Sequence, residues 1–347
     1  MVVHLNINKL NVDKVASINW GIIGCGNVTE VKSGPAFNKV ANSTLYGVMR
    51  RSEDKAADYA LRHNVPVWYS DATELINDPA INAIYIATPP KFHEAYVIAA
   101  IEKGKAVYVE KPVTLHVSSC KRMIDAVKMN EGKLTVAHYR RALPMFLKVK
   151  EMVHQQMLGR VSKIELKMFQ PHASDVIANL EDNWRIVPSL SGGGYFYDLA
   201  PHQLDILIYI FGDPLHSKGI SINQSMNYGA EDAVSGCIDF KNDIRFEGSW
   251  NFNMPESLKE DSCKIIGDRG YIEFPFFGNQ IKVVVDGVEE IIVIQHPAHI
   301  QQPMIERVVN YFLGDAENPC SLEEAIKSLD VMESFVYGQK NSVAINW

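Results

Sequence analysis

Short apolar segments alternate with helical segments through the first 138 residues of the chain. Helical periodicity appears at Glu53–His63, Phe92–Lys103 and Val117–Asn130. Strands that alternate with helices form parallel sheets with right-handed crossovers, so this half is predicted to be a doubly wound Rossmann fold. The predicted strands are Ile18–Gly24, Thr44–Met49, Val67–Tyr69, Ala83–Ala87, Lys105–Val109 and Lys133–Ala137.

After residue 138 the pattern changes to a long helix, Leu143–Leu158, followed by alternating strands and two amphipathic helices. Polar turns separate pairs of apolar segments, which is typical of antiparallel hairpins. We therefore predict an α/β protein of two domains. Residues 1–138 form an N-terminal extension and the Rossmann domain, and residues 139–347 form an α+β domain with a large, mostly antiparallel, open-faced sheet. The turns are Lys241–Asp243, Asp268–Gly270 and Asp286–Gly287, and the closing helices, Pro303–Leu313 and Leu322–Tyr337, can pack back on the first domain.

The composition is that of an ordinary globular protein. The 347 residues are 47% hydrophobic and 22% charged, with a net charge of -7. No basic block provides the attraction that phosphate-backbone binders depend on, so we expect no nucleic-acid partner. No apolar run approaches the ~20 residues that span a bilayer, and the N-terminus lacks a signal peptide's apolar stretch, so we expect no membrane partner. Five cysteines without CxxC spacing predict neither a disulfide framework nor a zinc site, and they favour a cytoplasmic location.

A glycine-rich turn follows the first predicted strand. Gly24-Cys25-Gly26 stands where a dinucleotide fold needs a tight turn and a backbone close to a pyrophosphate, with Asn27 and Val28 next in the chain. Thr29 replaces the third glycine of that fingerprint, so the following helix is expected to lie slightly further from the strand. A glycine turn after any buried strand is the alternative, which the surrounding β-α pattern disfavours.

The second predicted strand ends at Arg50-Arg51-Ser52, where a chain that prefers NAD(H) usually has an acidic residue for the ribose 2′-hydroxyl. Two guanidinium groups and a hydroxyl suit a 2′-phosphate, because arginine is always charged and binds phosphate through paired hydrogen bonds. We therefore predict that NADP(H) is preferred and that binding of NAD(H) is possible. A solvated arginine pair on a loop is the alternative.

Two further segments lie at the carboxyl ends of predicted parallel strands, where open α/β sheets bind ligands. Thr88, Pro89 and His93 follow the fourth strand, and Glu110 and Lys111 follow the fifth. All five are candidate cofactor-binding residues, and Lys111 can also reach a substrate. The alternatives are a structural role for His93 and a surface position for Lys111.

A glycine run at 192–194 precedes an acid and a histidine spaced four positions apart, Asp198 and His202. On a helix this spacing places both residues on one face. Pro201 indicates that they lie in the first turn of the helix, because proline disrupts later turns. A purely structural hydrogen bond between the two side chains is the alternative.

The segment before this glycine run carries Trp184 and Arg185. Arg185 is a candidate for binding sugar hydroxyls or a carboxylate, and Trp184 is a candidate for stacking on a sugar face. A core tryptophan beside a salt-bridged arginine is an equal alternative. The loops Phe169–Leu190 and Pro255–Lys259 are expected to decide which substrate binds.

From Ile18 onward the chain resembles the Gfo/Idh/MocA oxidoreductases, which include glucose–fructose oxidoreductase and inositol dehydrogenases. The resemblance rests on GIIGCG, ATPPKFH, EKP at 110–112, GGGYFYDLAPHQLD and IIGDRGYIEF, and EKP together with D-x-x-x-H is the specific part. It implies a C-terminal domain whose open sheet forms the subunit interface. It also implies that Lys111, Asp198 and His202 are the catalytic residues.

The implied reaction transfers a hydride between nicotinamide C4 and a secondary alcohol or ketone of a sugar, cyclitol or related polyol. His202, with an unperturbed pKa of about 6.5, suits proton transfer at the substrate oxygen. Lys111 can donate a hydrogen bond to the same oxygen and favour its negative charge, and Asp198 is expected to orient the imidazole. Trp184 and Arg185 complete the expected substrate site.

Three alternatives stay open. A metal enzyme would use His172, Asp198 and His202, but only the last two have a supported spacing, so we expect no metal. The same fold serves a non-catalytic NADP-binding sensor, which has no need of a proton donor beside the nicotinamide. A dihydrodiol or biliverdin-type reductase keeps the chemistry and changes the substrate.

For the dehydrogenase hypothesis we expect a small sugar or polyol as the bound substrate. We also expect a homodimer or homotetramer that forms through the C-terminal sheet. Burial against another subunit would explain apolar residues on the open face of that sheet.

Overall fold

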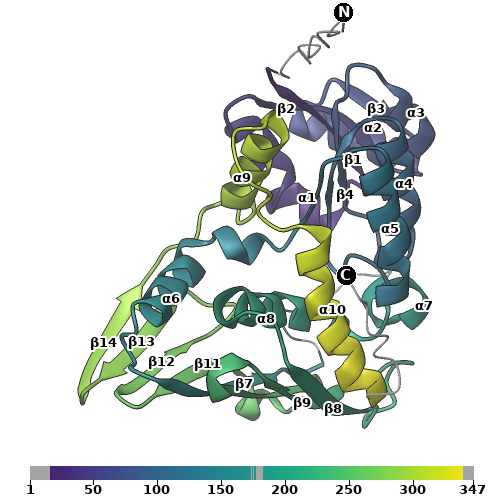
Figure 1. The fold of residues 1–347 in the computed structure, drawn as a ribbon. Helices are drawn as coiled ribbons and strands as arrows, with labels where there is room; N and C mark the ends of the chain where they lie inside the picture. The colour runs from purple at the N-terminus through teal and green to yellow at the C-terminus, as the bar shows by residue number, and fades with distance from the viewer. Residues whose placement is uncertain (1–15, 173, 175, 177–182, 339–347) are drawn as a thin grey trace, which may run out of the picture.

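The computed structural model describes residues 16–172, 174, 176 and 183–338, which form two sheets with helices around them (Figure 1). The N-terminal sheet has six parallel strands in the order β3-β2-β1-β4-β5-β6. The chain winds from β1 out to β3 and then from β4 to β6 in the opposite direction, which confirms the predicted Rossmann arrangement. The strands are β1 (Ile18–Ile23), β2 (Ser43–Met49), β3 (Val67–Tyr69), β4 (Ala83–Ile86), β5 (Ala106–Val109) and β6 (Leu134–Val136).

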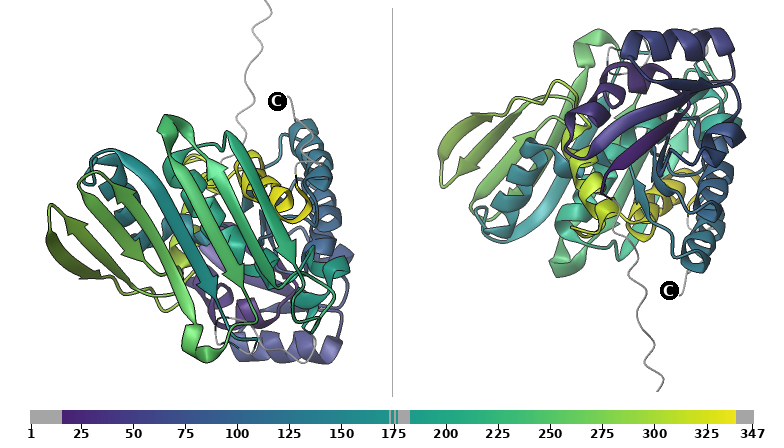
Figure 2. Two further views of the ribbon diagram at one scale, coloured as in Figure 1. Left: turned by 90° about the horizontal axis from the view of Figure 1, so that it is seen from below. Right: turned by 90° about the horizontal axis from the view of Figure 1, so that it is seen from above.

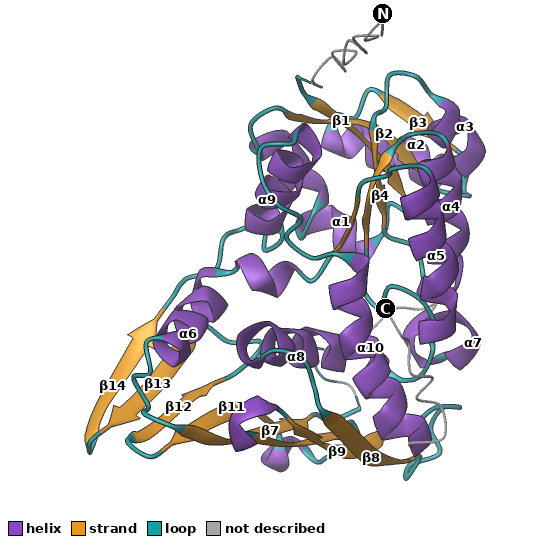
Figure 3. Cartoon of the chain, in the orientation of Figure 1, coloured by secondary structure: helices purple, strands orange, loops and turns teal. Residues whose placement is uncertain are grey.

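Helices cover this sheet, with α4 (His93–Glu102) and α5 (Val117–Met129) on one side and α9 (Gln302–Leu313) on the other (Figure 3). The helix α2 (Glu53–His63) has the predicted bounds, α4 is one residue shorter than predicted at each end, and α5 is one residue shorter at its C-terminal end. The residues at the helix ends set these boundaries. For example, Asn64 adopts a left-handed backbone conformation, which ends α2. The remaining helices of this domain are α1 (Asn27–Val31) and α3 (Ala72–Asn77).

The second sheet has eight strands in the order β14-β13-β12-β11-β7-β10-β9-β8. Neighbouring strands are antiparallel except for β10 and β7, which are parallel, so the prediction of a mostly antiparallel sheet is confirmed. The three predicted turns join β9 to β10, β11 to β12 and β13 to β14. The strands are β7 (Val161–Phe169), β8 (His216–Ile222), β9 (Ala233–Asp239), β10 (Arg245–Asn251), β11 (Glu260–Gly267), β12 (Gly270–Phe274), β13 (Gln280–Val285) and β14 (Val288–Val293).

One face of the second sheet is covered by α6 (Pro144–His154), α8 (Tyr195–Phe211) and α10 (Leu322–Tyr337), and among the described residues no α-helix lies across the other face (Figure 2, left). The centre of this open face is charged: Lys163 lies 2.8 Å from a Glu165 oxygen and 3.0 Å from a Glu247 oxygen. The prediction of an apolar open face is therefore wrong for its centre. Exposed apolar side chains occur on the edge strand β8, at Ile220 and Ile222.

The helix α8 is buried along nearly its whole length between the second sheet and the Rossmann domain (Figure 1). It begins at Tyr195, so Pro201 stands inside the helix and the prediction of a first-turn proline is wrong. Proline removes one backbone hydrogen bond there, and packing offsets this cost. Phe196, for example, packs edge-to-face on Trp250 at 5.1 Å. No helix in the described part of the chain is long and apolar enough to cross a membrane.

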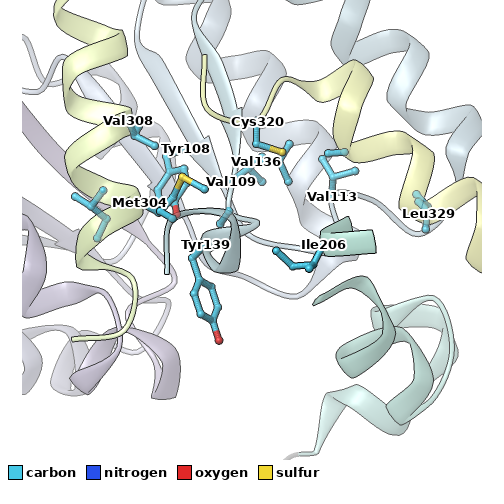
Figure 4. Close-up of a cluster of buried hydrophobic side chains, with 14 of the residues drawn as sticks. Tyr108, Val109, Val113, Val136, Tyr139, Ile206, Met304, Val308, Cys320 and Leu329 are labelled. Carbon is cyan, nitrogen blue, oxygen red and sulfur yellow. The ribbon is translucent and has the colours of Figure 1, made fainter. Parts of the chain in front are cut away.

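A shared apolar core joins the two domains, as Figure 4 shows for one part of it. Met304 and Val308 of α9 lie beside Tyr108 of β5, and the backbone of Cys320 accepts a hydrogen bond from Val136 of β6 at 3.0 Å. On the same side of the sheet, Trp20 of β1 packs on Phe312 of α9 at 5.6 Å. These contacts fix the carboxyl edge of the Rossmann sheet against the second domain.

Candidate active site

The glycine turn after β1 borders one end of a cleft at the carboxyl edge of the Rossmann sheet. Gly24 has a φ of +94°, and a Cβ there would lie 3.0 Å from the backbone of Ala87, so glycine is required. A Cβ on Gly26 would meet nothing closer than 3.9 Å. Gly26, Asn27 and Val28 therefore border open space, a cavity of about 250 Å³. Backbone N–H groups in the first turn of a helix lack intrahelical partners, which suits a pyrophosphate.

Thr29, which replaces the third fingerprint glycine, is buried and closes this turn. Its hydroxyl donates to the carbonyl oxygen of Gly26 at 2.8 Å. Its own carbonyl oxygen accepts a hydrogen bond from the Tyr59 hydroxyl at 2.8 Å. The threonine thus ties the glycine turn to α2.

Arg50 and Arg51 both line the first cavity. Arg50 Nη1 also donates to the carbonyl oxygen of Cys25 at 3.3 Å, which links the end of β2 to the glycine turn. Ser52 does not line this cavity; it is the exposed N-cap of α2, and its side chain makes no capping hydrogen bond. Two of the three residues predicted for the 2′-phosphate, Arg50 and Arg51, therefore lie at one end of the cleft, and Ser52 follows them outside its lining.

Thr88 and Pro89 line the first cavity after β4, whereas His93 lies behind it. The His93 ring is fully buried, with Nε2 2.7 Å from the carbonyl oxygen of Thr88 and Nδ1 3.2 Å from that of Val113. Burial lowers the pKa of His93, which keeps the ring neutral. The prediction that His93 binds the cofactor directly is wrong, because its ring joins the loops that follow β4 and β5.

A second cavity of about 780 Å³ continues from the first, and Thr88, Trp184 and Arg185 line both. Lys111 enters it from the end of β5, and Asp198 and His202 enter from α8. The fold thus brings together the three predicted catalytic residues.

Lys111 is fixed on Asp198. The Lys111 ammonium donates to Asp198 Oδ1 at 2.9 Å and to the carbonyl oxygen of the same residue at 2.7 Å. Arg185 Nε donates to the other carboxylate oxygen, Oδ2, at 3.0 Å. Burial by itself would raise the pKa of Asp198, but Lys111 and Arg185 hold it well below its usual range, so the carboxylate is charged.

His202 lies against Tyr139 and Phe277, with ring centroids 5.1 Å and 6.2 Å away. Burial, reinforced by the charge of Lys111, lowers the pKa of His202 well below its usual range, so the ring is neutral at pH 7. Its Nδ1 is buried and has no hydrogen-bond partner among the described residues. Because Lys111 and Arg185 occupy the Asp198 oxygens, the prediction that Asp198 orients the imidazole is wrong.

Glu110 lines the second cavity and is anchored in the core. Its Oε1 accepts hydrogen bonds from the Tyr85 hydroxyl at 2.5 Å and from Gln301 Nε2 at 2.7 Å. Its Oε2 accepts from the backbone N–H of Lys111 at 3.2 Å. Glu110 therefore positions the backbone from which the lysine side chain extends.

Trp184 and Arg185 form a stacked pair at the junction of the two cavities. The Arg185 guanidinium lies 4.6 Å from the Trp184 ring, and its Nη1 is buried with no hydrogen-bond partner among the described residues. Both candidate substrate residues thus face the cleft. Of the predicted specificity loop Phe169–Leu190, residues 173, 175 and 177–182 lie outside the described residues.

Several residues of the second cavity were missed by the sequence analysis. Arg140 lies in η3 (Tyr139–Ala142), just after β6, and the reasoning that selected Lys111 after β5 would have selected it too. No motif marks the others, which come from the turn after α1 and from the second half of the chain. They are Lys32, Phe277, His296, Ile300 and Gln301.

In the part of the chain that the structure describes, no three His, Cys, Asp or Glu side chains gather into a metal site. His172, the third candidate ligand, stacks on Tyr228 with ring centroids 6.1 Å apart. The described residues therefore provide no support for the metal-enzyme alternative.

Two family models match the chain. The model described as "Oxidoreductase family, NAD-binding Rossmann fold" matches residues 18–138, and the GFO/IDH/MocA C-terminal domain model matches residues 146–273. The first match covers all six strands of the Rossmann sheet, and the second covers β7 to β11 and most of β12, while β13 and β14 lie beyond it.

Relatives extend this similarity over nearly the whole chain. Oxidoreductase P35 of Formosa agariphila is 48% identical over 318 residues, which cover 92% of this chain and 98% of that protein. The 1,5-anhydro-D-fructose reductase of Ensifer adhaerens is 26% identical over 65% of this chain and 66% of its own length. A solved levoglucosan dehydrogenase, in complex with NADH and levoglucosan, shares the fold with a TM-score of 0.80 at 20% identity, covering 92% of this chain and 96% of that one.

Proposed function

Since the chain belongs to the Gfo/Idh/MocA oxidoreductase family, we propose that it transfers a hydride between NADP(H) and a CH–OH carbon of a sugar, cyclitol or related polyol. The observation that carries the proposal is that Lys111 and His202 line one cavity, which continues from the glycine turn. A sugar-type substrate is supported by the names of two similar proteins, the 1,5-anhydro-D-fructose reductase and the levoglucosan dehydrogenase.

The residues of the second cavity divide the proton chemistry between them. When bound, the nicotinamide cofactor supplies the site that accepts or donates the hydride. Neutral His202 takes the hydroxyl proton as the alcohol is oxidised and returns it to the carbonyl oxygen in the reverse direction. The Lys111 ammonium donates a hydrogen bond to the same oxygen and stabilises its negative charge. Asp198 is a positioning residue, because it acts by fixing Lys111.

The residues of the first cavity fit a dinucleotide phosphate. The open space beside Gly26, Asn27 and Val28 would hold the pyrophosphate. Arg50 and Arg51 would hold the 2′-phosphate, with Ser52 beside them, and this supports a preference for NADP(H) over NAD(H). The proposed reaction uses no metal ion.

The cysteines support the proposed cytoplasmic location. All five are unpaired thiols and four of them are buried. Burial raises the pKa of Cys25, which lines the first cavity, to about 11. A protonated, buried thiol is inert, so the chain has no need of a disulfide-forming compartment.

A substrate screen tests the proposal directly. Neutral and acidic sugars, inositols and keto-sugars are offered with NADP+ or NADPH, and turnover is followed at the nicotinamide absorbance. We expect turnover of at least one compound, and a loss of about 10²–10⁴-fold in kcat for both His202→Ala and Lys111→Ala. The variant Arg122→Ala, at an exposed arginine, serves as the control, and both site variants must still bind NADPH.

Two outcomes would contradict the proposal. Losses below about tenfold in both variants contradict the proton-transfer and charge-stabilising roles of Lys111 and His202. A wild-type protein that binds NADPH but turns over none of the compounds favours the non-catalytic sensor.

A further inference from the structure

We propose that the second cavity recognises a carboxylate of the substrate through Arg140, so that its substrate class is a sugar acid. The inference rests on the proposed function and names its substrate more closely. Arg140 lines the cavity, yet only 2% of its surface is exposed. Its Nη1 donates to the backbone carbonyl oxygen of Phe276 at 2.5 Å, and its Nε has no hydrogen-bond partner among the described residues.

The charge of Arg140 lacks a direct counter-ion. A buried charge is costly unless it is paired, and no carboxylate among the described residues forms an ion pair with this guanidinium. Asp261 is close enough to feel its charge: burial raises the pKa of Asp261, and Arg140 lowers it. However, the oxygens of Asp261 accept hydrogen bonds from the backbone N–H groups of Phe276 at 3.0 Å and Phe277 at 2.7 Å.

The other buried cations of the cavity are already paired. Lys111 and Arg185 share the Asp198 carboxylate, at 2.9 Å and 3.0 Å. Arg185 also keeps an unpartnered Nη1, but its charge is balanced by Asp198, so among the described residues Arg140 is the buried cation of the cavity without a carboxylate partner. A carboxylate matches a single unpaired guanidinium in charge and in planar geometry. A dianion would add repulsion from Glu110 and Asp198, which line the same cavity.

Arg140 lies close enough to His202 for one substrate molecule to contact both side chains. Its guanidinium lies 4.4 Å from the centroid of the Phe277 ring, and the His202 ring packs edge-to-face on the same phenyl group. One small molecule in the cavity can therefore contact both groups. The carboxylate would hold the sugar acid at Arg140 while its hydroxyl carbon faces His202 and Lys111.

Binding to the protein without added cofactor tests the inference independently of turnover, because no hydride acceptor is then present. Three acids, D-glucuronate, D-galacturonate and D-gluconate, are compared by calorimetry with their neutral counterparts D-glucose, D-galactose and D-glucitol. We expect at least one acid to bind tenfold or more tightly than its counterpart, about the contribution of one hydrogen bond between charged groups. The inference is overturned if no acid has this advantage, or if D-glucose 6-phosphate binds more tightly than every acid. Either result leaves the activity screen, and thus the proposed hydride transfer, to be judged separately.

Substitution of Arg140 assigns the preference to this residue. In Arg140→Met the acid-to-neutral ratio of affinities should fall to within about threefold of one, and Arg140→Lys, which keeps the charge, should retain part of it. The matched control Arg122→Met, at an exposed arginine of α5, should keep the wild-type ratio. An unchanged ratio in Arg140→Met contradicts the inference, because a guanidinium that only supports the loop at Phe276 would not select between acid and neutral ligands. If Arg140→Met fails to fold, Arg140→Lys and the wild-type comparison decide the question.

Discussion

The charge state of one imidazole governs the direction in which the proposed acid–base step runs most easily. His202 is surrounded by aromatic rings and by the cations Lys111 and Arg140, and both burial and these charges lower its pKa. A neutral imidazole is a base that is ready to accept a proton, so the ground state suits oxidation of an alcohol.

The pH profile of oxidation follows from this pKa. Because the pKa of His202 is lowered, its ring stays neutral at pH values at which a free imidazole would be protonated. The value of kcat/KM for oxidation should therefore stay constant as the pH falls from 8 through about 6.5. The measurement is kcat/KM against pH for wild type and for His202→Gln. An acidic limb centred at or above about pH 6.5 that vanishes in His202→Gln would contradict a lowered pKa.

Cofactor choice is a second property that single side chains decide. Arg50→Ala/Arg51→Ala should raise KM for NADPH at least tenfold more than KM for NADH, because only NADPH loses a charge-assisted contact to the 2′-phosphate. The control is Arg245→Ala/Arg269→Ala, at two arginines of the second sheet that pair with Asp239 and Asp286. Equal increases in both KM values would mean that Arg50 and Arg51 do not bind the 2′-phosphate.

Residue types and spacing predicted which side chains would meet, but not how they would pair. Asp198 and His202 do share a cavity, as their spacing of four positions predicts. The partner of Asp198, however, is Lys111, which is 87 positions away in the chain, and that contact depends on the packing of two domains. Arg140 is not among the site residues predicted from the sequence, because it belongs to none of the motifs, although it follows a parallel strand as Lys111 does.

At the scale of elements, a buried ion pair fixes α8 against the Rossmann sheet. Arg141, in η3 after β6, donates from Nε and Nη2 to the Asp205 carboxylate of α8 at 2.9 Å and 2.8 Å. Both side chains are only 2% exposed. Asp205 lies one turn after His202, so this pair also determines where the imidazole stands.

Breaking this pair should destabilise the fold strongly. Asp205→Asn leaves the buried Arg141 guanidinium with only the half-exposed Glu324 carboxylate, 3.1 Å from its Nη1, as a counter-ion. We expect the free energy of unfolding to fall by about 3 kcal/mol, the lower end of the cost of breaking a buried pair. Asp58→Asn makes the same chemical change in an exposed pair with Arg62 and should cost about 1 kcal/mol or less. Urea denaturation measures both. Similar losses in the two variants would show that burial does not strengthen the Arg141–Asp205 pair.

Local patterns predicted most elements well, since apolar runs and caps act within a few residues. The six Rossmann strands and α2, α4, α5 and α10 follow such signals. The start of α8 does not, because the cost of an internal Pro201 is offset by packing on Trp250 and the second sheet, which a local pattern does not contain. The predicted helix Leu143–Leu158 ends early, at His154, where Gln155 and Gln156 turn the chain toward β7.

At the scale of the whole molecule, the helix-free face of the second sheet is the surface available for self-association (Figure 2). Its centre carries the Lys163, Glu165 and Glu247 cluster, and its edge strand β8 exposes Ile220 and Ile222. A polar centre with apolar residues at the edge suits a two-fold interface in which charges meet their opposites.

We therefore propose a homodimer or homotetramer built on this face. Ile220→Glu should shift the protein toward smaller species in sedimentation velocity, because it places a charge on the apolar edge that the proposed interface would bury. Leu61→Glu, at an apolar side chain of α2 that is 80% exposed, should leave the assembly intact. A wild-type monomer, or dissociation by Leu61→Glu and not by Ile220→Glu, would contradict an interface on the second sheet.

Lys111 and His202 are proposed to act on one molecule at the end of a dinucleotide cleft. A crystal structure with NADP+ bound would show where that molecule lies. We predict a nicotinamide ring in the second cavity, with C4 turned toward the space between the Lys111 ammonium and the His202 imidazole. A nicotinamide ring bound outside that cavity, or a lysine and a histidine that face separate compartments once the cofactor is in place, would contradict the account.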